Sequence, residues 1–186
     1  MIRPLSQKTP VILFGDHIAA YGVVRALGPQ GIPIYLVSPV TTWNVCKSSR
    51  YVKDVFVLPH ADAHYFEKLL SWGLATVGKE AVLIIAGADE PLDVLPQRLA
   101  DFPVGWQATF PDASTVGRVR EKAITYQIAQ KIGIPVPKTQ PIKNNEDFII
   151  FKKNMSAWDL PLLLKAEKSS DFNREYGTKG IVFNNY

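Results

Sequence analysis

The feature of the sequence that most constrains its fold is a series of short apolar runs that alternate with helix-like segments. Four runs stand out, at residues 11–14, 34–37, 55–58 and 82–85. Each is apolar throughout, which is typical of strands that are covered on both faces of a sheet. Because helix patterns lie between the runs, the order of elements predicts an α/β fold with a Rossmann-like parallel sheet. We expect the four runs to be its central strands.

In a parallel sheet of this kind, ligands bind beyond the carboxyl ends of the strands. The rim positions here are Gly15, Asp16 and His17 after the first run, Ser38 after the second, and Ala88, Asp89 and Glu90 after the fourth. Asp16 has two interpretations, as the cap of the helix that follows, which is favoured, or as a ligand contact. The next glycine after Gly15 is Gly22, so the dinucleotide fingerprint is absent and NAD is disfavoured. Gly22 is interpreted as the residue that lets this helix pack closely against the sheet.

Composition excludes several classes of protein. The chain has 186 residues, of which 47% are hydrophobic and 20% charged, and this favours a globular protein. No apolar run approaches the ~18 residues of a membrane helix, and the N-terminus lacks the apolar stretch of a secretory signal. We therefore expect a cytoplasmic protein with neither membrane nor nucleic acid as a partner. A single cysteine, Cys46, excludes an intramolecular disulfide and a zinc site built from cysteines.

The pattern of apolar and polar residues changes after residue 112. Residues 114–132 have the pattern of one long helix, which Gly133 would end as a left-handed cap. The chain is therefore divided into an α/β domain at 1–112, a connecting helix at 113–133 and a partial α+β subdomain at 134–186.

The last segment is small. It predicts a short helix at 146–154 and strands at 160–165 and 179–184. Two strands and one helix cannot bury a core of their own, so either this segment packs against the first domain or the chain is a fragment.

The charge of the chain is distributed unevenly. Up to residue 112 there are 9 Lys and Arg against 10 Asp and Glu, whereas from residue 113 onward there are 12 against 7. Lys165 ends an apolar strand, and burying an unpaired ammonium group is costly, so this lysine needs an anion. The loop that follows combines glycines with Lys168, Arg174 and Lys179, as a phosphate cover would. An equally favoured interpretation is a β-hairpin whose charged side chains are solvated and bind no ligand.

The other candidate sites have weaker support in the sequence. His60 and His64 have the spacing of a metal-binding pair on a helix, but no third ligand is apparent, and surface histidines are favoured. There is no Gly-x-Ser-x-Gly motif and no supported Cys/His pair, so nucleophilic hydrolysis has no basis in the sequence.

The order of features resembles the ATP-grasp superfamily. The match comprises an α/β domain, Glu-Lys-Ala at 121–123 in a helix, Gly-Ile-Pro-Val-Pro at 133–137, and Leu-Pro-Leu-Leu-Leu-Lys at 160–165. It covers nearly the whole chain and is similar to the opening of the ATP-dependent carboxylate-amine ligases, such as D-alanine:D-alanine ligase, biotin carboxylase and D-aspartate ligase-like proteins.

The resemblance implies a set of ATP phosphate-binding residues. The two lysines of the family fall on Lys122 and Lys165, and its glycine-rich phosphate loop falls on residues 169–180, with Ser169, Ser170, Gly177, Lys179 and Gly180. It also implies that the α/β domain helps to bind the acceptor substrate, at Gly15, Asp16, Asp89 and Glu90.

The implied reaction uses ATP and Mg²⁺ to convert a small carboxylate substrate into an acylphosphate, which an amine then opens. The family's Mg²⁺ ligands and adenine pocket lie in a second lobe that this sequence does not contain, so the chain is expected to be an inactive N-terminal fragment. A homodimer is left open. The alternative is a non-catalytic Rossmann-like module that binds a small ligand or a partner chain.

Overall fold

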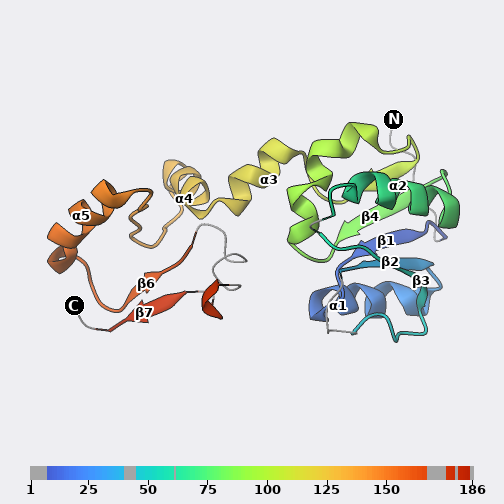
Figure 1. Cartoon of the computed structure of the whole chain (residues 1–186), viewed down its shortest axis with the longest axis horizontal. Coiled ribbons are helices and arrows are strands. Elements are labelled where there is room, and N and C mark those ends of the chain that lie inside the picture. Colours follow the sequence, from blue (N-terminus) through green and yellow to red (C-terminus); the bar gives the residue numbers. More distant parts are fainter. Residues whose placement is uncertain (1–7, 40–44, 61, 167–174, 179, 185–186) are drawn as a thin grey trace. The chain divides into compact units, whose positions relative to one another are not determined.

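The computed structural model describes residues 8–39, 45–60, 62–166, 175–178 and 180–184. The chain forms two units, Met1–Val116 and Gly117–Tyr186 (Figure 1). Their boundary falls within the segment that was expected to be a connecting helix. The first unit contains a five-stranded sheet, and the second contains helices and a two-stranded sheet.

The sheet of the first unit is parallel throughout, with the strand order β3-β2-β1-β4-β5. The predicted parallel α/β fold is therefore confirmed. Its strands are β1 (Val11–Phe14), β2 (Ile34–Ser38), β3 (Val52–Val57), β4 (Val82–Ala86) and β5 (Trp106–Ala108).

Two expectations about the strands need correction. The run at 55–58 is not central, because β3 lies at one edge of the sheet, where a strand has only one neighbour and Lys53, Asp54 and Val57 are exposed. β5 is a fifth strand that the sequence did not predict. At three residues, it is too short for an apolar pattern to distinguish it from a loop.

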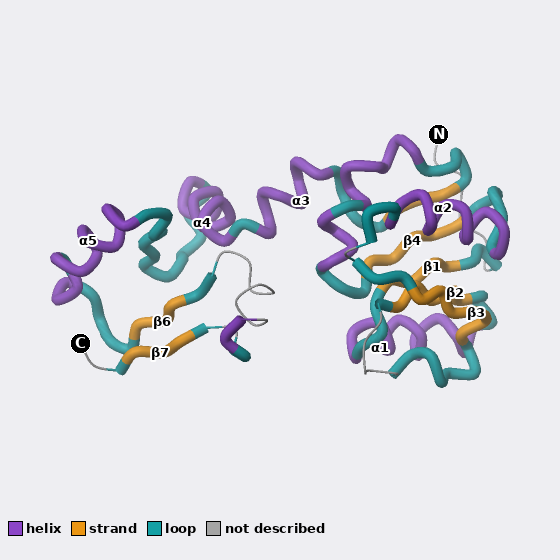
Figure 2. The backbone as a smooth tube through the Cα atoms, viewed as in Figure 1, coloured by secondary structure: helices purple, strands orange, loops and turns teal. Residues whose placement is uncertain are grey.

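Helices cover both faces of the sheet, with α1 (Ile18–Leu27) on one side and α2 (Tyr65–Thr76) on the other (Figure 2). Neighbouring residues of β1 serve opposite layers because side chains alternate along a strand. Ile12 and Phe14 join the core cluster of α2, whereas Val11 and Leu13 join that of α1. Short helical turns η1 (Gly28–Gln30), η2 (Glu90–Asp93) and η3 (Leu95–Asp101) complete the unit.

The close approach between α1 and the sheet is made at Gly87 and not at Gly22. Gly22 is exposed, and a Cβ atom there would meet nothing within 4 Å. At Gly87 a Cβ atom would lie 2.6 Å from the carbonyl oxygen of Phe14 and 3.0 Å from Cβ of Ala20. The interpretation of Gly22 is therefore wrong, and the residue after β4 has the packing role instead.

The second unit contains α4 (Lys122–Lys131), α5 (Asn145–Lys153), the turn η4 (Met155–Ala157) and an antiparallel pair of strands, β6 (Leu162–Leu164) and β7 (Ile181–Phe183). α3 (Ala113–Arg120) crosses the boundary between the units. Gly133 has a φ of 78°, as expected for a left-handed cap.

The connecting helix expected at 113–133 is not continuous. It breaks at Glu121, whose extended backbone (φ −76°, ψ 104°) separates α3 from α4. In an unbroken helix, the carbonyls of Arg118 and Val119 would accept from backbone N–H groups four residues later. The hydroxyl of Thr125 lies 3.0 Å and 3.1 Å from these two carbonyl oxygens, so a side chain competes with the helical ladder.

The second unit has no buried core among its described residues, because none of them from Gly117 onward is buried. The apolar residues Val119 and Ile132 are 64% and 66% exposed. Across the described part of the chain, no helix is both long enough and apolar enough to span a membrane.

Candidate functional site

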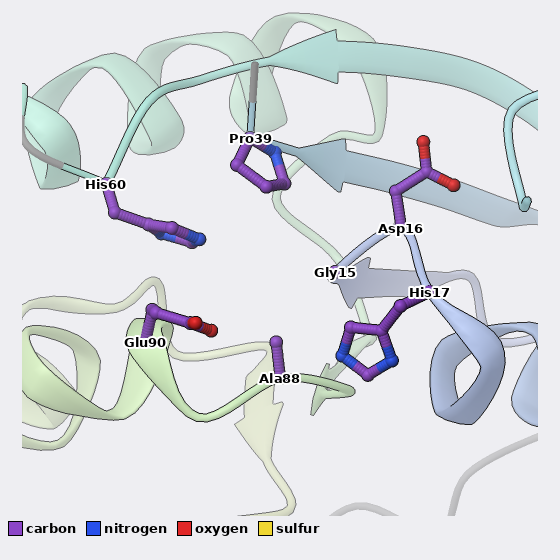
Figure 3. Close-up of a pocket in the computed structure, with 7 residues that line it drawn as sticks. All are labelled: Gly15, Asp16, His17, Pro39, His60, Ala88 and Glu90. Atoms are coloured by element: carbon purple, nitrogen blue, oxygen red, sulfur yellow. The ribbon is translucent and has the colours of Figure 1, made fainter. Parts of the chain in front are cut away.

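A pocket opens where β1 and β4 end, at the point where the strand order reverses (Figure 3). This switch point is the usual ligand position in an open parallel sheet, since the loops after the two strands diverge there. The cavity has a volume of about 290 Å³, and its lining residues are Gly15, Asp16, His17, Pro39, His60, Ala88 and Glu90. The structure thus brings together three of the four rim residues expected at the acceptor-substrate site.

Gly15 allows the turn after β1 to approach the loop after β4. Its φ of +103° is a conformation that residues with a side chain rarely adopt. A Cβ atom at Gly15 would also lie only 3.0 Å from Cβ of Ala88. A side chain at this position would therefore strain the backbone and push the two walls of the pocket apart.

Asp16 is buried and shapes one wall of the pocket. Its carboxylate accepts from the Cys46 backbone N–H at 2.6 Å and from the Ser38 hydroxyl at 3.2 Å, and it lies 3.5 Å from Nζ of Lys47. Figure 3 shows the carboxylate directed away from the cavity. The capping role favoured for Asp16 is wrong, because the α1 cap is His17, whose Nδ1 accepts from the Ala19 N–H at 3.2 Å.

The contacts around Asp16 also determine the protonation state of Cys46, the only cysteine of the chain. Burial and the neighbouring Asp16 carboxylate raise the pKa of the Cys46 thiol to about 12. Cys46 is therefore a protonated thiol at neutral pH, and it packs against the carbonyl oxygen of His17 at 3.7 Å.

The two acidic residues after β4, Asp89 and Glu90, lie in different environments. Both residues are exposed, but Glu90 begins η2 and lines the pocket, whereas Asp89 lies outside the lining. The backbone carbonyl of Asp89 accepts from the Leu92 N–H at 3.0 Å, so this residue closes the turn that presents Glu90.

The sequence analysis assigned His60 to the surface, but in the structure this residue lines the pocket. It is half-buried, its Nδ1 has no hydrogen-bond partner among the described residues, and its side chain points into the cavity opposite Glu90 (Figure 3). Burial lowers the pKa of His60, and Glu90 and Asp93 oppose this in part. The surface interpretation holds for His64, which is exposed, but not for His60. Its place just after β3 was the signal that could have identified it.

Tyr65 lies behind His60, with ring centroids 5.8 Å apart. Its side chain is 3% exposed, and its hydroxyl is also without a partner among the described residues. Burial and the nearby Glu90 charge raise the pKa of this hydroxyl, so it stays protonated.

The expected phosphate-binding residues belong to the second unit. Lys122 is half-buried and is the first residue of α4. Lys165 follows β6 and is exposed, so the buried environment expected for it is wrong; the strand before it has no layer packed over it. A Cβ atom at Gly180 would lie 3.2 Å from Cγ of Lys165, so these two residues are neighbours.

The remaining residues of the expected phosphate loop are only partly within the described structure. Gly177 has a φ of +67°, and Thr178 donates a hydrogen bond from its hydroxyl to the Gly180 carbonyl at 2.9 Å. Ser169, Ser170 and Lys179 lie outside the described residues.

Comparison with solved structures gives matches over nearly the whole chain. An N5-carboxyaminoimidazole ribonucleotide synthetase in complex with ADP matches 100% of this chain and 43% of its own length, with a TM-score of 0.69 and 12% identity. The same enzyme from Thermotoga maritima matches 95% and 41%, with a TM-score of 0.58 and 14% identity.

A third match is the biotin carboxylase domain of the Hydrogenobacter thermophilus 2-oxoglutarate carboxylase, a dimer in complex with MgADP, ADP and bicarbonate. It has a TM-score of 0.55 and 19% identity, and covers 94% of this chain and 37% of its own. No protein-family model matches the sequence, and no curated protein matches it.

The chain spans about two fifths of the length of the synthetases it matches. All three matches are ATP-grasp enzymes, and their identities of 12–19% establish likeness of fold. The chain therefore shares the fold of the corresponding portion of these enzymes.

Proposed function

We propose that this chain is the acceptor-substrate and phosphate-binding part of an ATP-dependent carboxylate-amine ligase. The observation that carries the proposal is that the fold match extends over both units, including the segments with Lys122 and Lys165. Two of the matched structures hold ADP, one of them as its magnesium complex. The proposal places ATP at the second unit and the acceptor substrate at the first.

The local structure of Lys122 suits an anion. It opens α4, whose N-cap is Glu121 and whose first turn has no acidic residue, and it lies at the positive end of the helix dipole. An ammonium group at such a position adds to a field that already favours phosphate.

Lys165 would act together with the segment that returns to β7. Gly180 lies against its aliphatic stem, and Gly177 supplies a left-handed turn. In the proposal Ser169, Ser170 and Lys179 complete the phosphate cover. The excess of cations from residue 113 onward, 12 against 7 anions, supports an anionic ligand in this part of the protein.

In the proposed reaction, a substrate carboxylate oxygen attacks the γ-phosphorus of ATP and ADP leaves, giving an acylphosphate. The amine, as its free base, then attacks the acyl carbon; phosphate leaves, and the nitrogen releases a proton to solvent as the amide forms. This chain's lysines would hold the phosphates and offset their charge, and positioning would supply much of the rest. No group of three or more His, Cys, Asp or Glu among the described residues could hold a metal, so the Mg²⁺ that accompanies ATP has no ligand assigned in this chain.

The proposal can be tested on the chain itself by titrating MgATP and following backbone amide NMR signals. Weak binding is expected, with a Kd on the order of 1 mM, because only phosphate contacts are available. The shifts should gather at α4 and around Lys165, and Lys122→Ala and Lys165→Ala should each weaken them. Lys79→Ala, an exposed lysine of the first unit, is the matched control.

We also propose that the chain alone does not hydrolyse ATP. ATP turnover that Lys165→Ala abolishes would contradict this. Shifts confined to the first unit, or equal effects of Lys79→Ala and Lys165→Ala, would contradict the phosphate site.

A non-catalytic ligand-binding module is the second candidate, and one observation favours it. The pocket lined by His60 and Glu90 is formed entirely by the first unit, which has its own core. Under this alternative a small ligand would bind the pocket while MgATP would leave the second unit unperturbed. A homodimer, as in the matched biotin carboxylase domain, belongs to the ligase proposal and is measurable by sedimentation.

A further inference from the structure

The pocket of the first unit is lined by negative charge. Its lining contains two carboxylates, Asp16 and Glu90, and neither lysine nor arginine. Residues 40–44, which continue from Pro39, and Ala61, which follows His60, add no lysine or arginine in the sequence. An anionic ligand would therefore meet like charge from these carboxylates, whereas a cation would meet opposite charge.

Of the two carboxylates, only Glu90 is available to a ligand. Asp16 is directed away from the cavity and has Lys47 at 3.5 Å, as well as two hydrogen-bond donors. Glu90 is exposed, points into the cavity and forms no ion pair among the described residues. Glu90 therefore contributes most of the charge that a ligand would meet.

His60 faces the same space from the opposite wall (Figure 3). Its Nδ1 is buried and has no hydrogen-bond partner among the described residues, and native proteins rarely leave such an atom unpaired. A neutral imidazole has one nitrogen that accepts a hydrogen bond. Together, His60 and Glu90 offer two acceptors, one neutral and one anionic, across one cavity.

We propose that this pocket binds the ammonium form of a small primary amine, with the Glu90 carboxylate as its counter-ion and an imidazole nitrogen of His60 as a second hydrogen-bond acceptor. The cavity of about 290 Å³ is of the size that a small ligand fills. The inference deepens the proposed ligase function, on which it rests for the role of the ligand: the acceptor substrate in this pocket would be the amine, which accepts the acyl group, and the carboxylate would bind outside the pocket.

The pocket can be tested without nucleotide. The chain has three histidines, so the ring C–H signals of His60 can be assigned by NMR from His60→Gln and His64→Gln. Glycinamide is the amine probe, and acetamide and propionate are its neutral and anionic counterparts. Glycinamide should shift the His60 signals saturably, and the other two should not.

The matched variants are Glu90→Gln and Asp89→Asn, which remove one negative charge each from neighbouring residues, inside and outside the pocket lining respectively. Glu90→Gln should weaken glycinamide binding at least tenfold, and Asp89→Asn should change it less than twofold. The indole N–H signal of Trp106, which donates to the Gly78 carbonyl, verifies that each variant keeps its fold.

Shifts by propionate equal to those by glycinamide, no saturable glycinamide shift, or equal effects of the two variants would overturn the inference. Because these titrations contain no nucleotide, their outcome is independent of the MgATP titration. Loss of the MgATP response with glycinamide binding intact would remove the ligase role and leave the amine site.

Discussion

The two units of this chain have similar sequence patterns but very different burial. In the first unit, the apolar residues of β1 are all buried, and two clusters cover the two faces of one sheet. In the second, α5 carries Phe148, Ile149 and Ile150 exposed, and β7 is exposed along its whole length. A local apolar pattern thus indicates which surface of an element can be covered, but a second layer must be present before that surface is buried.

The largest expected contrast between the units comes from a matched pair of phenylalanines. Phe14 is 0% exposed and Phe148 is 49% exposed. Phe14→Ala should cost about 3–5 kcal/mol of unfolding free energy, because it leaves a cavity in the core. Phe148→Ala should change the unfolding free energy of the first unit by less than about 0.5 kcal/mol. Urea denaturation followed by the Trp106 signal measures both, and equal losses would break the comparison.

The next contrast is between two aspartates of the first unit. Asp16→Ala should cost about 2–3 kcal/mol, because the buried Cys46 N–H and Ser38 hydroxyl lose their acceptor. Asp89→Ala, at an exposed position, should stay within about 0.5 kcal/mol of the parent protein. Thermal unfolding at pH 7 tests the pair. A stable Asp16→Ala variant would show that the loop at 45–47 does not depend on this carboxylate.

A pair of helix glycines sharpens the comparison of the units. A Cβ atom at Gly73 would lie 2.4 Å from the Trp106 ring, whereas one at Gly117 would meet nothing within 4 Å. Gly73→Ala should therefore destabilise the first unit by about 1–2 kcal/mol through overpacking. Gly117→Ala should stabilise α3 by about 0.5–1 kcal/mol, which circular dichroism of the helix signal would register. Changes of the same sign would contradict the difference in packing.

The smallest effect expected is a pH dependence of the first unit. Because burial lowers the pKa of His60, the folded state binds this proton less readily than the unfolded state does. Stability is thus complete above the unfolded histidine pKa of about 6.5 and declines as the pH falls below it. His60→Gln should flatten this decline, and His64→Gln should not. An unchanged acid limb in His60→Gln would show that His60 makes no such contribution.

The parallel sheet could be predicted from the sequence because each of its main strands is a continuous apolar run. The switch-point pocket followed from the same reasoning, since Gly15 and Glu90 come directly after two of those runs. Other details could not be predicted. The break at Glu121 depends on a side chain four residues later, and the role of Asp16 depends on Cys46, which is distant in the sequence. His60 was missed because, although it comes soon after β3, nothing in the local sequence indicates that its ring lies opposite Glu90.

The position of β1 also has a consequence for how the protein is synthesised. β1 emerges from the ribosome before the other strands of its sheet but lies in the middle of that sheet, with β2 on one side and β4 on the other. Val11 pairs with both Ile34 and Leu83. The edge of β1 that pairs with β4 therefore stays unpaired until most of the first unit has been translated. An apolar strand with an open edge is a site for wrong pairing. Slow translation before residue 83 should therefore lengthen the exposure of the nascent chain to aggregation, whereas slow translation after residue 108, where β5 ends, should not.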